Sequence, residues 1–268
     1  MAHARLVVLA AGARHTPGIL KRSRVRQRRI GRGLHTHPNA KVVGFFDQRL
    51  DAWKGTHQAF HIHHFLEEGI LLGYAAVPPG LLAASLPGIG RENAATMARY
   101  NQMLTAAPLI EDDNEGRVLL GPDRQPYMFF NLWGQDLERV HRGVRMTAEL
   151  LFAAGAREVL TPFADLPMLR SGDDLRLIDQ RPRRAAGIEL MTVHIMGTAA
   201  MSPDPARGAT EETGRIHGLE GVVVADASVI PTSIGVNPQE TIIAMSLRNA
   251  DRWADALGAS RRRAVSAA

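Results

Sequence analysis

The sequence contains no cysteine among its 268 residues, which excludes disulfide bonds and thiolate-bound metals. Because a chain without disulfides suits a reducing compartment, we expect a cytoplasmic protein. Long hydrophobic runs are also missing. The apolar stretch Leu6–Ala11 is too short to cross a bilayer, and it lacks the flanks of a signal peptide. We therefore expect no membrane span.

A complete dinucleotide fingerprint is missing as well. The pattern G-x-G-x-x-G between a strand and a helix seats a pyrophosphate at the helix amino terminus. The only near match, Gly-Arg-Gly at 31–33, has no third glycine at the required spacing and follows a basic loop rather than a strand. The sequence therefore does not predict a complete dinucleotide-binding domain.

Acidic residues are in the minority: 27 Asp and Glu stand against 32 Lys and Arg, which gives a net charge of +5. Much of the excess lies in the run 21–32 and in the tail Arg261-Arg262-Arg263. No aromatic residues interleave with the run, and no nucleic-acid motif accompanies it. We therefore expect a solvated basic loop and a frayed tail, and no nucleic-acid partner.

The composition, with 45% hydrophobic and 22% charged residues, is that of an ordinary globular protein with one or two domains. An amphipathic helix with one apolar stripe is predicted from Asp136 to about Gly155. Strands clustered between 41 and 189, with helices on one face, predict a mixed α+β fold. The other predicted elements there are helices over 81–86, 93–104 and 174–179, and strands over 41–47, 56–65, 68–77, 108–112, 117–120, 127–133 and 157–160, with a turn at 113–116.

Two groups of histidines invite interpretation as metal ligands. His35 and His37 lie two residues apart, and His61 and His63 would share one face of a strand. No carboxylate or cysteine set accompanies either pair, so we expect no metal site.

Near the amino terminus, residues 5–11 predict a buried strand that ends at Gly12, and Thr16-Pro17 resembles a helix start. A glycine at the end of such a strand allows close approach of the backbone to a ligand. Strand-glycine-helix turns are common, so this feature is weak evidence when taken alone.

The most informative stretch begins at His194 and ends with the last predicted helix. The run Val222–Val224 predicts a buried strand that ends at Asp226. After a loop rich in Ser, Thr and Gly, Asn237 is suited to cap a helix and Pro238 to occupy its first position. The N–H groups at such a helix start favour negative charge. An apolar stripe along this helix consists of Ile243, Leu247, Ala250, Ala254 and Leu257.

Four stretches carry a resemblance to a known family. HIMGTAAMSPDP, from His194, and VVVADASVIPTSIGVNPQETIIAMSLRNAD, from Val222, resemble the carboxy-terminal signature of the glucose-methanol-choline (GMC) flavin oxidoreductases. ARLVVLAAGARHTPGILKRS, from Ala4, resembles the second flavin-contacting signature of that family, and GRGLHTHPNAKVVGFFD, from Gly31, resembles the next segment in long-chain alcohol oxidases. The pairing of a His with the Asn of GVNP is closest to the long-chain alcohol oxidase and cholesterol-oxidase-like branch.

The resemblance implies FAD as cofactor and oxidation of an alcohol CH–OH group to a carbonyl, with the hydride going to flavin N5. In this interpretation His194 is the catalytic acid/base, and Asn237 holds the substrate oxygen or the flavin edge. The helix that begins at Pro238 would stabilise charge on the reduced flavin. Asp226 and Ala227 match a residue pair whose backbone approaches FAD in the family.

Gly12, His15 and Thr16 match the contact zone of the second signature. The main candidates also have purely structural interpretations, since a lone loop histidine is often structural, Asn237 could be only a helix cap and Asp226 could only begin a turn. Their order and spacing within one block favour a functional site.

The resemblance also implies a domain organisation. Residues 1–40 and 190–268 would be the remnant of an FAD-binding α/β domain, and 41–189 would form a substrate-binding or cap domain. The Leu, Ala and Met content of the latter suits an apolar alcohol, although core packing alone explains the same composition.

Because the fingerprint for the ADP half of FAD is absent, we expect an enzyme that is incomplete or that is completed by a second chain. The alternative function is a non-catalytic module that binds an apolar ligand or a partner chain. Such a module would expose the surface on which the missing half of the FAD-binding domain would pack.

Overall fold

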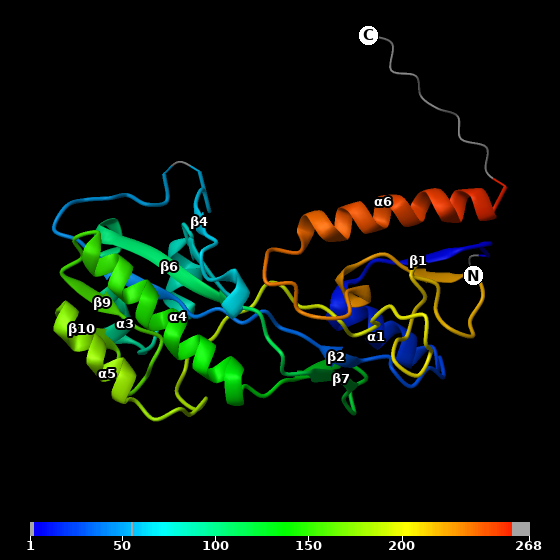
Figure 1. Cartoon of the computed structure of the whole chain (residues 1–268), viewed down its shortest axis with the longest axis horizontal. Coiled ribbons are helices and arrows are strands. Elements are labelled where there is room, and N and C mark those ends of the chain that lie inside the picture. The colour runs from blue at the N-terminus through cyan, green and yellow to red at the C-terminus, as the bar shows by residue number, and fades with distance from the viewer. Residues whose placement is uncertain (1–2, 55, 259–268) are drawn as a thin grey trace, which may run out of the picture. The chain divides into compact units, whose positions relative to one another are not determined.

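The computed structural model describes residues 3–54 and 56–258, which form two compact units (Figure 1). The first unit consists of the chain up to 35, of 115–130 and of the chain from 195 onward, and the second consists of 36–114 and 131–194. The predicted boundaries place 115–130 in the substrate-binding domain, whereas this segment packs within the first unit. The predicted frayed tail at 261–263 lies outside the described residues. Within the described ranges, no helix is long and apolar enough to cross a membrane.

The second unit is built on a six-stranded sheet with the order β10-β9-β3-β6-β5-β4. All neighbouring strands are antiparallel. The strands are β3 (Val42–Phe45), β4 (His61–Ile62), β5 (Ile70–Tyr74), β6 (Met103–Ile110), β9 (Glu158–Leu160) and β10 (Met168–Leu169).

Helix α4 (Gly134–Ala153) packs along this sheet, as predicted. Gly143 lies so close to β6 that an added Cβ would come within 2.5 Å of the Pro108 side chain. The short helices α2 (Pro79–Ala84) and α3 (Arg91–Met97) contribute side chains to a hydrophobic core cluster around Val43 and Phe45. The mixed α+β class is therefore confirmed. The predicted stripe of α4 is buried throughout, at Leu137, Val140, Val144, Ala148 and Leu151.

Two local predictions for this unit are wrong. The helix expected over 93–104 ends at Met97, because Met103 begins β6, which pairs with strands on both sides. The strand expected over 56–65 is reduced to the two residues of β4. In both places pairing and packing with distant segments override the local pattern. Short 3₁₀ turns at Leu66–Glu68, Tyr100–Gln102 and Gly172–Asp174, and helix α5 (Leu175–Gln180), complete the unit.

The segment after β6 does not form the predicted hairpin over 108–120. Strand β7 (Gly116–Leu120) pairs instead with β8 (Pro126–Phe129) and with β2 (Arg32–Leu34) in a separate three-stranded sheet. Two runs separated by a plausible turn sequence thus belong to different sheets, since only the tertiary partners decide the pairing.

The first unit also contains the parallel pair β1 (Val7–Leu9) and β11 (Val222–Val224). Helix α1 (Gly12–Arg22) follows β1, and a 3₁₀ turn, η4 (Ala227–Val229), follows β11. Both segments contribute to one apolar core with residues of the 199–216 region. This strand-turn-helix arrangement agrees with the predicted α/β element, but β1 is not the buried strand that was predicted, because Val7 and Val8 are largely exposed. The core consists of Leu20, Ile30, Ala199, Ala209, Ile216, Val224 and Val229.

Helix α1 begins at Gly12, four residues before the predicted start, and therefore has Pro17 inside it. A proline has no N–H for the carbonyl of the residue four positions earlier, which is Ala13. The hydroxyl of Thr198 donates to that carbonyl at 2.7 Å. A side chain from a distant segment thus satisfies the carbonyl and allows the proline within the helix.

Helix α6 (Gln239–Ala256) starts one residue later than predicted, with Pro238 rather than Asn237 at the capping position. Its predicted stripe does not face the core, because Ile243 is 50% exposed and Leu247 65% exposed. The buried positions are Asn249 and Trp253, whose indole N–H donates to the Thr213 carbonyl at 2.9 Å. This hydrogen bond and the packing of Met245 against the core of the first unit hold the helix, and an apolar face remains open.

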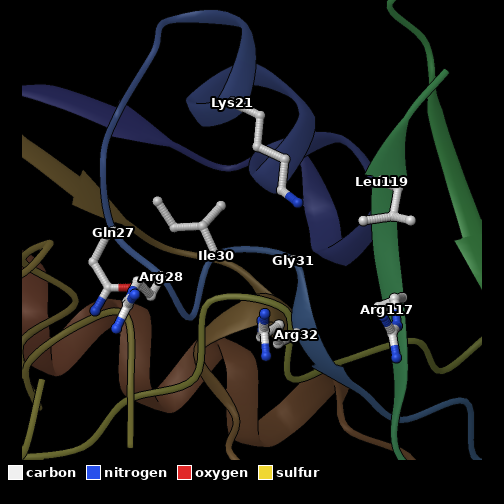
Figure 2. A pocket seen from close by; sticks show the side chains of 8 residues that line it. All are labelled: Lys21, Gln27, Arg28, Ile30, Gly31, Arg32, Arg117 and Leu119. Carbon is white, nitrogen blue, oxygen red and sulfur yellow. The ribbon is translucent and has the colours of Figure 1, made fainter. Parts of the chain in front are cut away.

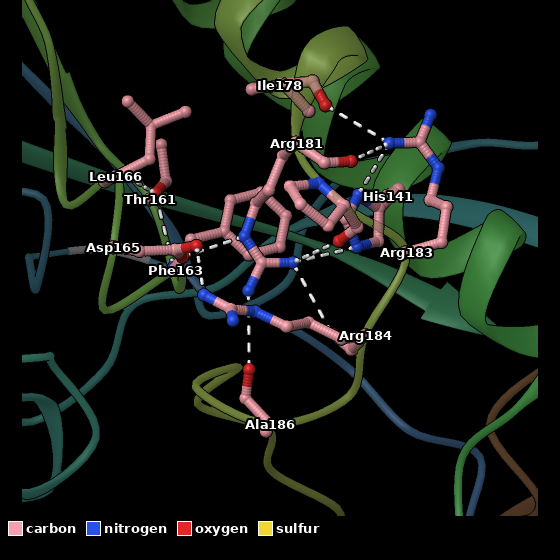
Figure 3. Close-up of polar contacts among 11 residues, drawn as sticks. His141, Thr161, Phe163, Asp165, Leu166, Ile178, Arg181, Arg183, Arg184 and Ala186 are labelled. Atoms are coloured by element: carbon pink, nitrogen blue, oxygen red, sulfur yellow. Dashed lines mark hydrogen bonds and ion pairs between the residues drawn. The ribbon is translucent and has the colours of Figure 1, made fainter.

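A buried arginine holds the loop after α5 in the second unit (Figure 3). The guanidinium of Arg181 lies 4.3 Å from the centre of the Phe163 ring and forms an ion pair with Asp165 at 2.8 Å. It also lies 3.0 Å from Nε2 of His141, while Arg183 lies 3.1 Å from Nδ1. A neutral imidazole accepts at only one nitrogen. Since Arg183 has another acceptor in the Arg181 carbonyl at 2.9 Å, we assign Nε2 as the acceptor for Arg181.

We expect this cluster to make stability depend on pH. Burial, followed by the charges of Arg183 and Arg181, lowers the pKa of His141 from 6.5 to about 4. Between these values the unfolded chain binds the proton and the folded chain does not, so stability falls as the pH drops from 6.5 to 4. The part due to His141 is at most about 3 kcal/mol.

The measurement is urea denaturation over this pH range for the wild type and for His141→Gln. The glutamine amide can accept from Arg181 but does not titrate. We expect the wild type to lose more stability on acidification than the variant. Parallel pH curves would contradict the assignment.

Candidate functional site

Asp226 connects the two strand ends of the first unit. One carboxylate oxygen accepts from the backbone N–H of Gly12 at 2.9 Å and from the Thr16 hydroxyl. The other accepts from the backbone N–H of Ser228 at 2.8 Å and from its hydroxyl. Three of the predicted site residues, Gly12, Thr16 and Asp226, are therefore in direct contact.

Gly12 begins α1 with a φ of +77°, a conformation that strongly favours glycine. An added Cβ would meet no atom within 4 Å, so the space beside this residue is open. Both β1 and β11 end here in parallel, and ligands bind outside the carboxyl ends of parallel strands. The open space beside the first N–H groups of α1 suits an anionic group.

The two loops of the carboxy-terminal block run side by side in this unit. The backbone N–H groups of Gly197, Ala199 and Met201 donate to the carbonyls of Ala227, Ser228 and Val229, at 3.2, 2.8 and 2.8 Å respectively. A cavity of about 440 Å³ lies beside them. Its lining includes residues of both loops, namely Ala200, Met201, Ser202, Pro231 and Thr232.

Gly33 and Gly197 lie in close backbone contact. An added Cβ on Gly197 would come within 1.9 Å of the Gly33 carbonyl oxygen. Next to this contact, His35 and Met196 exchange two backbone hydrogen bonds of 3.0 Å. The segment from Gly31 is thus joined to the segment after His194, which the sequence alone did not reveal.

The other predicted cofactor residues have different environments. His15 is exposed on α1, Ala227 uses its carbonyl to accept from Gly197, and Pro238 is buried at the start of α6. Asn237 is half-buried in the first unit, whereas His194 belongs to the second. The convergence of His194 and Asn237 therefore stays a prediction.

In the second unit His194 lies beside another histidine. Its Nδ1 is 3.1 Å from Nδ1 of His37, and the ring centres are 5.1 Å apart. His194 is half-buried, and desolvation lowers its pKa from the usual 6.5. Both the partial burial of His194 and its lowered pKa favour a neutral imidazole at neutral pH. The Nδ1 atom of this imidazole is in hydrogen-bond contact with His37.

The position of His37 is fixed by its backbone. Its φ is +47°, an uncommon value for a residue other than glycine. The buried carboxylate of Asp112 accepts from the backbone N–H groups of Thr36 and His37, both at 2.8 Å. A second connection runs through Thr192, whose hydroxyl donates to the Thr36 carbonyl and accepts from the His194 N–H at 3.2 Å.

These contacts hold two distant turns together, and they indicate a role for His37 that the sequence interpretation missed. The sequence pattern marks this residue only as a candidate metal ligand. The available signal was its position in the segment that resembles long-chain alcohol oxidases. Among the described residues no cluster suited to a metal ion occurs.

Comparison with known proteins identifies the family. A model described as GMC oxidoreductase matches residues 113–246, and the amino-terminal model of the same family matches 1–39. The chain belongs to the GMC oxidoreductase family. It is 36% identical, over 248 residues, to an uncharacterized GMC-type oxidoreductase of Mycobacterium tuberculosis. That match covers 92% of this chain and 39% of the relative, so the chain spans well under half the length of that protein.

Other GMC relatives extend the comparison. A long-chain-alcohol oxidase of Arabidopsis thaliana is 26% identical over 260 residues, covering 89% of this chain and 35% of that protein. Formate oxidase of Aspergillus oryzae shares the fold with a TM-score of 0.66 at 19% identity, covering 94% of this chain and 54% of the other.

FAD is the cofactor of this family, whose solved structures include an FAD-dependent oxidoreductase of Chaetomium thermophilum. The residues around Gly12 fit such a group, since the glycine leaves open space at the carboxyl ends of two parallel strands.

Proposed function

We propose that this chain is part of an FAD-dependent oxidoreductase that acts on the CH–OH group of an apolar alcohol. Family membership supports the cofactor and the reaction class, and the long-chain-alcohol oxidases among the relatives support the substrate class. The observation that carries the proposal for this chain is the His37–His194 contact, which holds the half-buried imidazole of His194 through its Nδ1.

The proposed roles follow from hydrogen-bond chemistry. His194 donates its Nδ1–H to Nδ1 of His37, so that Nε2 carries the lone pair that takes the proton of the alcohol. His37 then stabilises the imidazolium through the same hydrogen bond, and the Asp112 turn keeps His37 in place. When bound, FAD supplies the acceptor for the electrons of the C–H bond.

Further proposed roles belong to residues of the first unit. Asn237 binds the substrate oxygen or the edge of the cofactor. The backbone N–H groups at the start of α6, next to Pro238, would stabilise negative charge on the reduced cofactor. Gly12, His15, Thr16, Asp226 and Ala227 form the cofactor contact zone. In this proposal Asp226 acts by holding the Gly12 turn to the end of β11.

The ADP half of the cofactor requires a glycine-rich fingerprint that these 268 residues do not contain. We therefore propose that a longer form of the chain or a second chain supplies it. Exposed apolar residues support this: Val7 and Val8 of β1 are 46% and 48% exposed, and α6 presents an open apolar face.

The test is an absorbance spectrum of purified protein, with and without a fingerprint-bearing segment. We expect weak or no FAD binding by the 268-residue chain and stoichiometric FAD in the completed protein. Anaerobic addition of a long-chain primary alcohol should then bleach the flavin band, while the matching alkane should not. A stoichiometric flavoprotein from the short chain would contradict the need for the missing half, and a completed flavoprotein that no alcohol reduces would contradict the function.

The alternative is a non-catalytic module that binds a partner chain, and the same exposed surface favours it. In that case the completed protein would hold no FAD, while the partner would still associate. The spectrum therefore separates the two functions.

A further inference from the structure

A second cavity in the first unit, of about 300 Å³, has a strongly positive lining (Figure 2). Lys21 extends into it from α1, while Arg32 and Arg117 lie on strands β2 and β7. Four of its lining residues are cationic, and none is acidic. The lining consists of Lys21, Gln27, Arg28, Ile30, Gly31, Arg32, Arg117 and Leu119.

Two of the arginines face each other across a strand pair. Strand register places Arg32 directly opposite Arg117, an arrangement in which like charges repel. No residue in the described ranges forms a hydrogen bond or an ion pair with the guanidinium of Arg28, Arg32 or Arg117. An anion between them would replace repulsion by attraction on both sides.

Lys21 is positioned by its surroundings. Its ammonium group donates to the Val118 carbonyl at 2.9 Å, which leaves two N–H donors for another acceptor. Gly31 makes room for it, because an added Cβ would come within 2.8 Å of Nζ. Burial, followed by the charge of Arg32, lowers the pKa of Lys21, and a bound anion would reverse that shift.

We propose that this cavity binds a phosphate-bearing small molecule. Guanidinium and ammonium groups are the usual donors to phosphate oxygens. The volume lies at the lower end of the range for ligand pockets, and Ile30 and Leu119 add apolar wall. The basic run at 21–32 is thus in part a binding wall rather than only a solvated loop.

This cavity is separate from the Gly12 turn. Gly12 and Lys21 lie near opposite ends of α1, about 14 Å apart along its axis. The proposal therefore stands independently of flavin binding and of the proposed oxidoreductase activity.

Isothermal titration calorimetry of the 268-residue chain with inorganic pyrophosphate tests the proposal. Arms with inorganic phosphate and acetate at matched ionic strength separate a diphosphate group, a single phosphate and a simple anion. We expect Arg117→Gln to weaken pyrophosphate binding roughly tenfold or more, since it removes a charge-assisted contact. Arg26→Gln is the matched control, because Arg26 is exposed, belongs to the same basic run and does not line the cavity.

Pyrophosphate should also raise the melting temperature of the wild type more than that of Arg117→Gln, because the ligand binds only the folded state. Equal weakening of pyrophosphate binding by both variants would show that the net positive charge attracts the anion non-specifically, and would overturn the proposal. Equal binding of acetate, or retention of a single-stranded oligonucleotide in place of pyrophosphate, would overturn it as well.

Discussion

Replacing His194 with alanine lowers the rate of flavin reduction by alcohol roughly 10²–10⁴-fold, the range for a positioned acid/base. The reason is that Nε2 of this residue is the proposed acceptor of the alcohol proton, while its Nδ1 is engaged by His37 at 3.1 Å. The measurement is single-turnover reduction of the completed, FAD-loaded protein, followed by stopped-flow absorbance. His61→Ala is the control, since this histidine is exposed on β4.

Variants of His37 separate chemistry from folding in the same assay. Asparagine tolerates the positive φ of this position and its amide oxygen can accept from His194, whereas leucine can do neither. We expect His37→Leu to slow reduction roughly 10–100-fold, as loss of an orienting partner does, and His37→Asn to retain more of the rate. Unchanged reduction in His194→Ala would remove this residue from the mechanism, and equal rates in the two His37 variants would remove the orienting role.

Changing Asp226 to asparagine lowers the free energy of unfolding by roughly 2–4 kcal/mol, although the side chain keeps its shape. The carboxylate accepts from Gly12, Thr16 and Ser228, and all of these groups are donors at its two oxygens. An amide group places N–H against one of the two donor pairs, so that the backbone N–H of either Gly12 or Ser228 loses its acceptor. We expect the denaturation midpoint in urea to fall while the slope stays constant.

Asp123→Asn is the control for this measurement, because Asp123 is an exposed carboxylate that accepts from the backbone of Gln125 and from Tyr127. Its midpoint should remain close to that of the wild type. If Asp226→Asn matched this control, the carboxylate would not be what joins the ends of β1 and β11.

Local sequence determined the elements whose residues form their own pattern. The stripe of α4 and the strand β11 were predicted correctly, because a helical period specifies the first and a short β-branched run specifies the second. The family resemblance rested on four stretches, which begin at Ala4, Gly31, His194 and Val222. In this way the sequence alone indicated the family, which the comparisons confirm, and proposed the candidate residues.

Tertiary structure decided the partners. Pro17 lies within a helix because Thr198 supplies the missing donor. Strand β7 pairs with β2 and β8 and not with the segment at 108–112. His37 faces His194, and Arg117 faces Arg32, through contacts between segments that lie far apart in the chain. The periodicity of a sequence shows only which face of a helix or strand is apolar. The interaction energy of two side chains depends on the distance between them and on their burial, which the fold determines. For that reason the contact between His37 and His194 and the basic cavity are visible only in the folded chain.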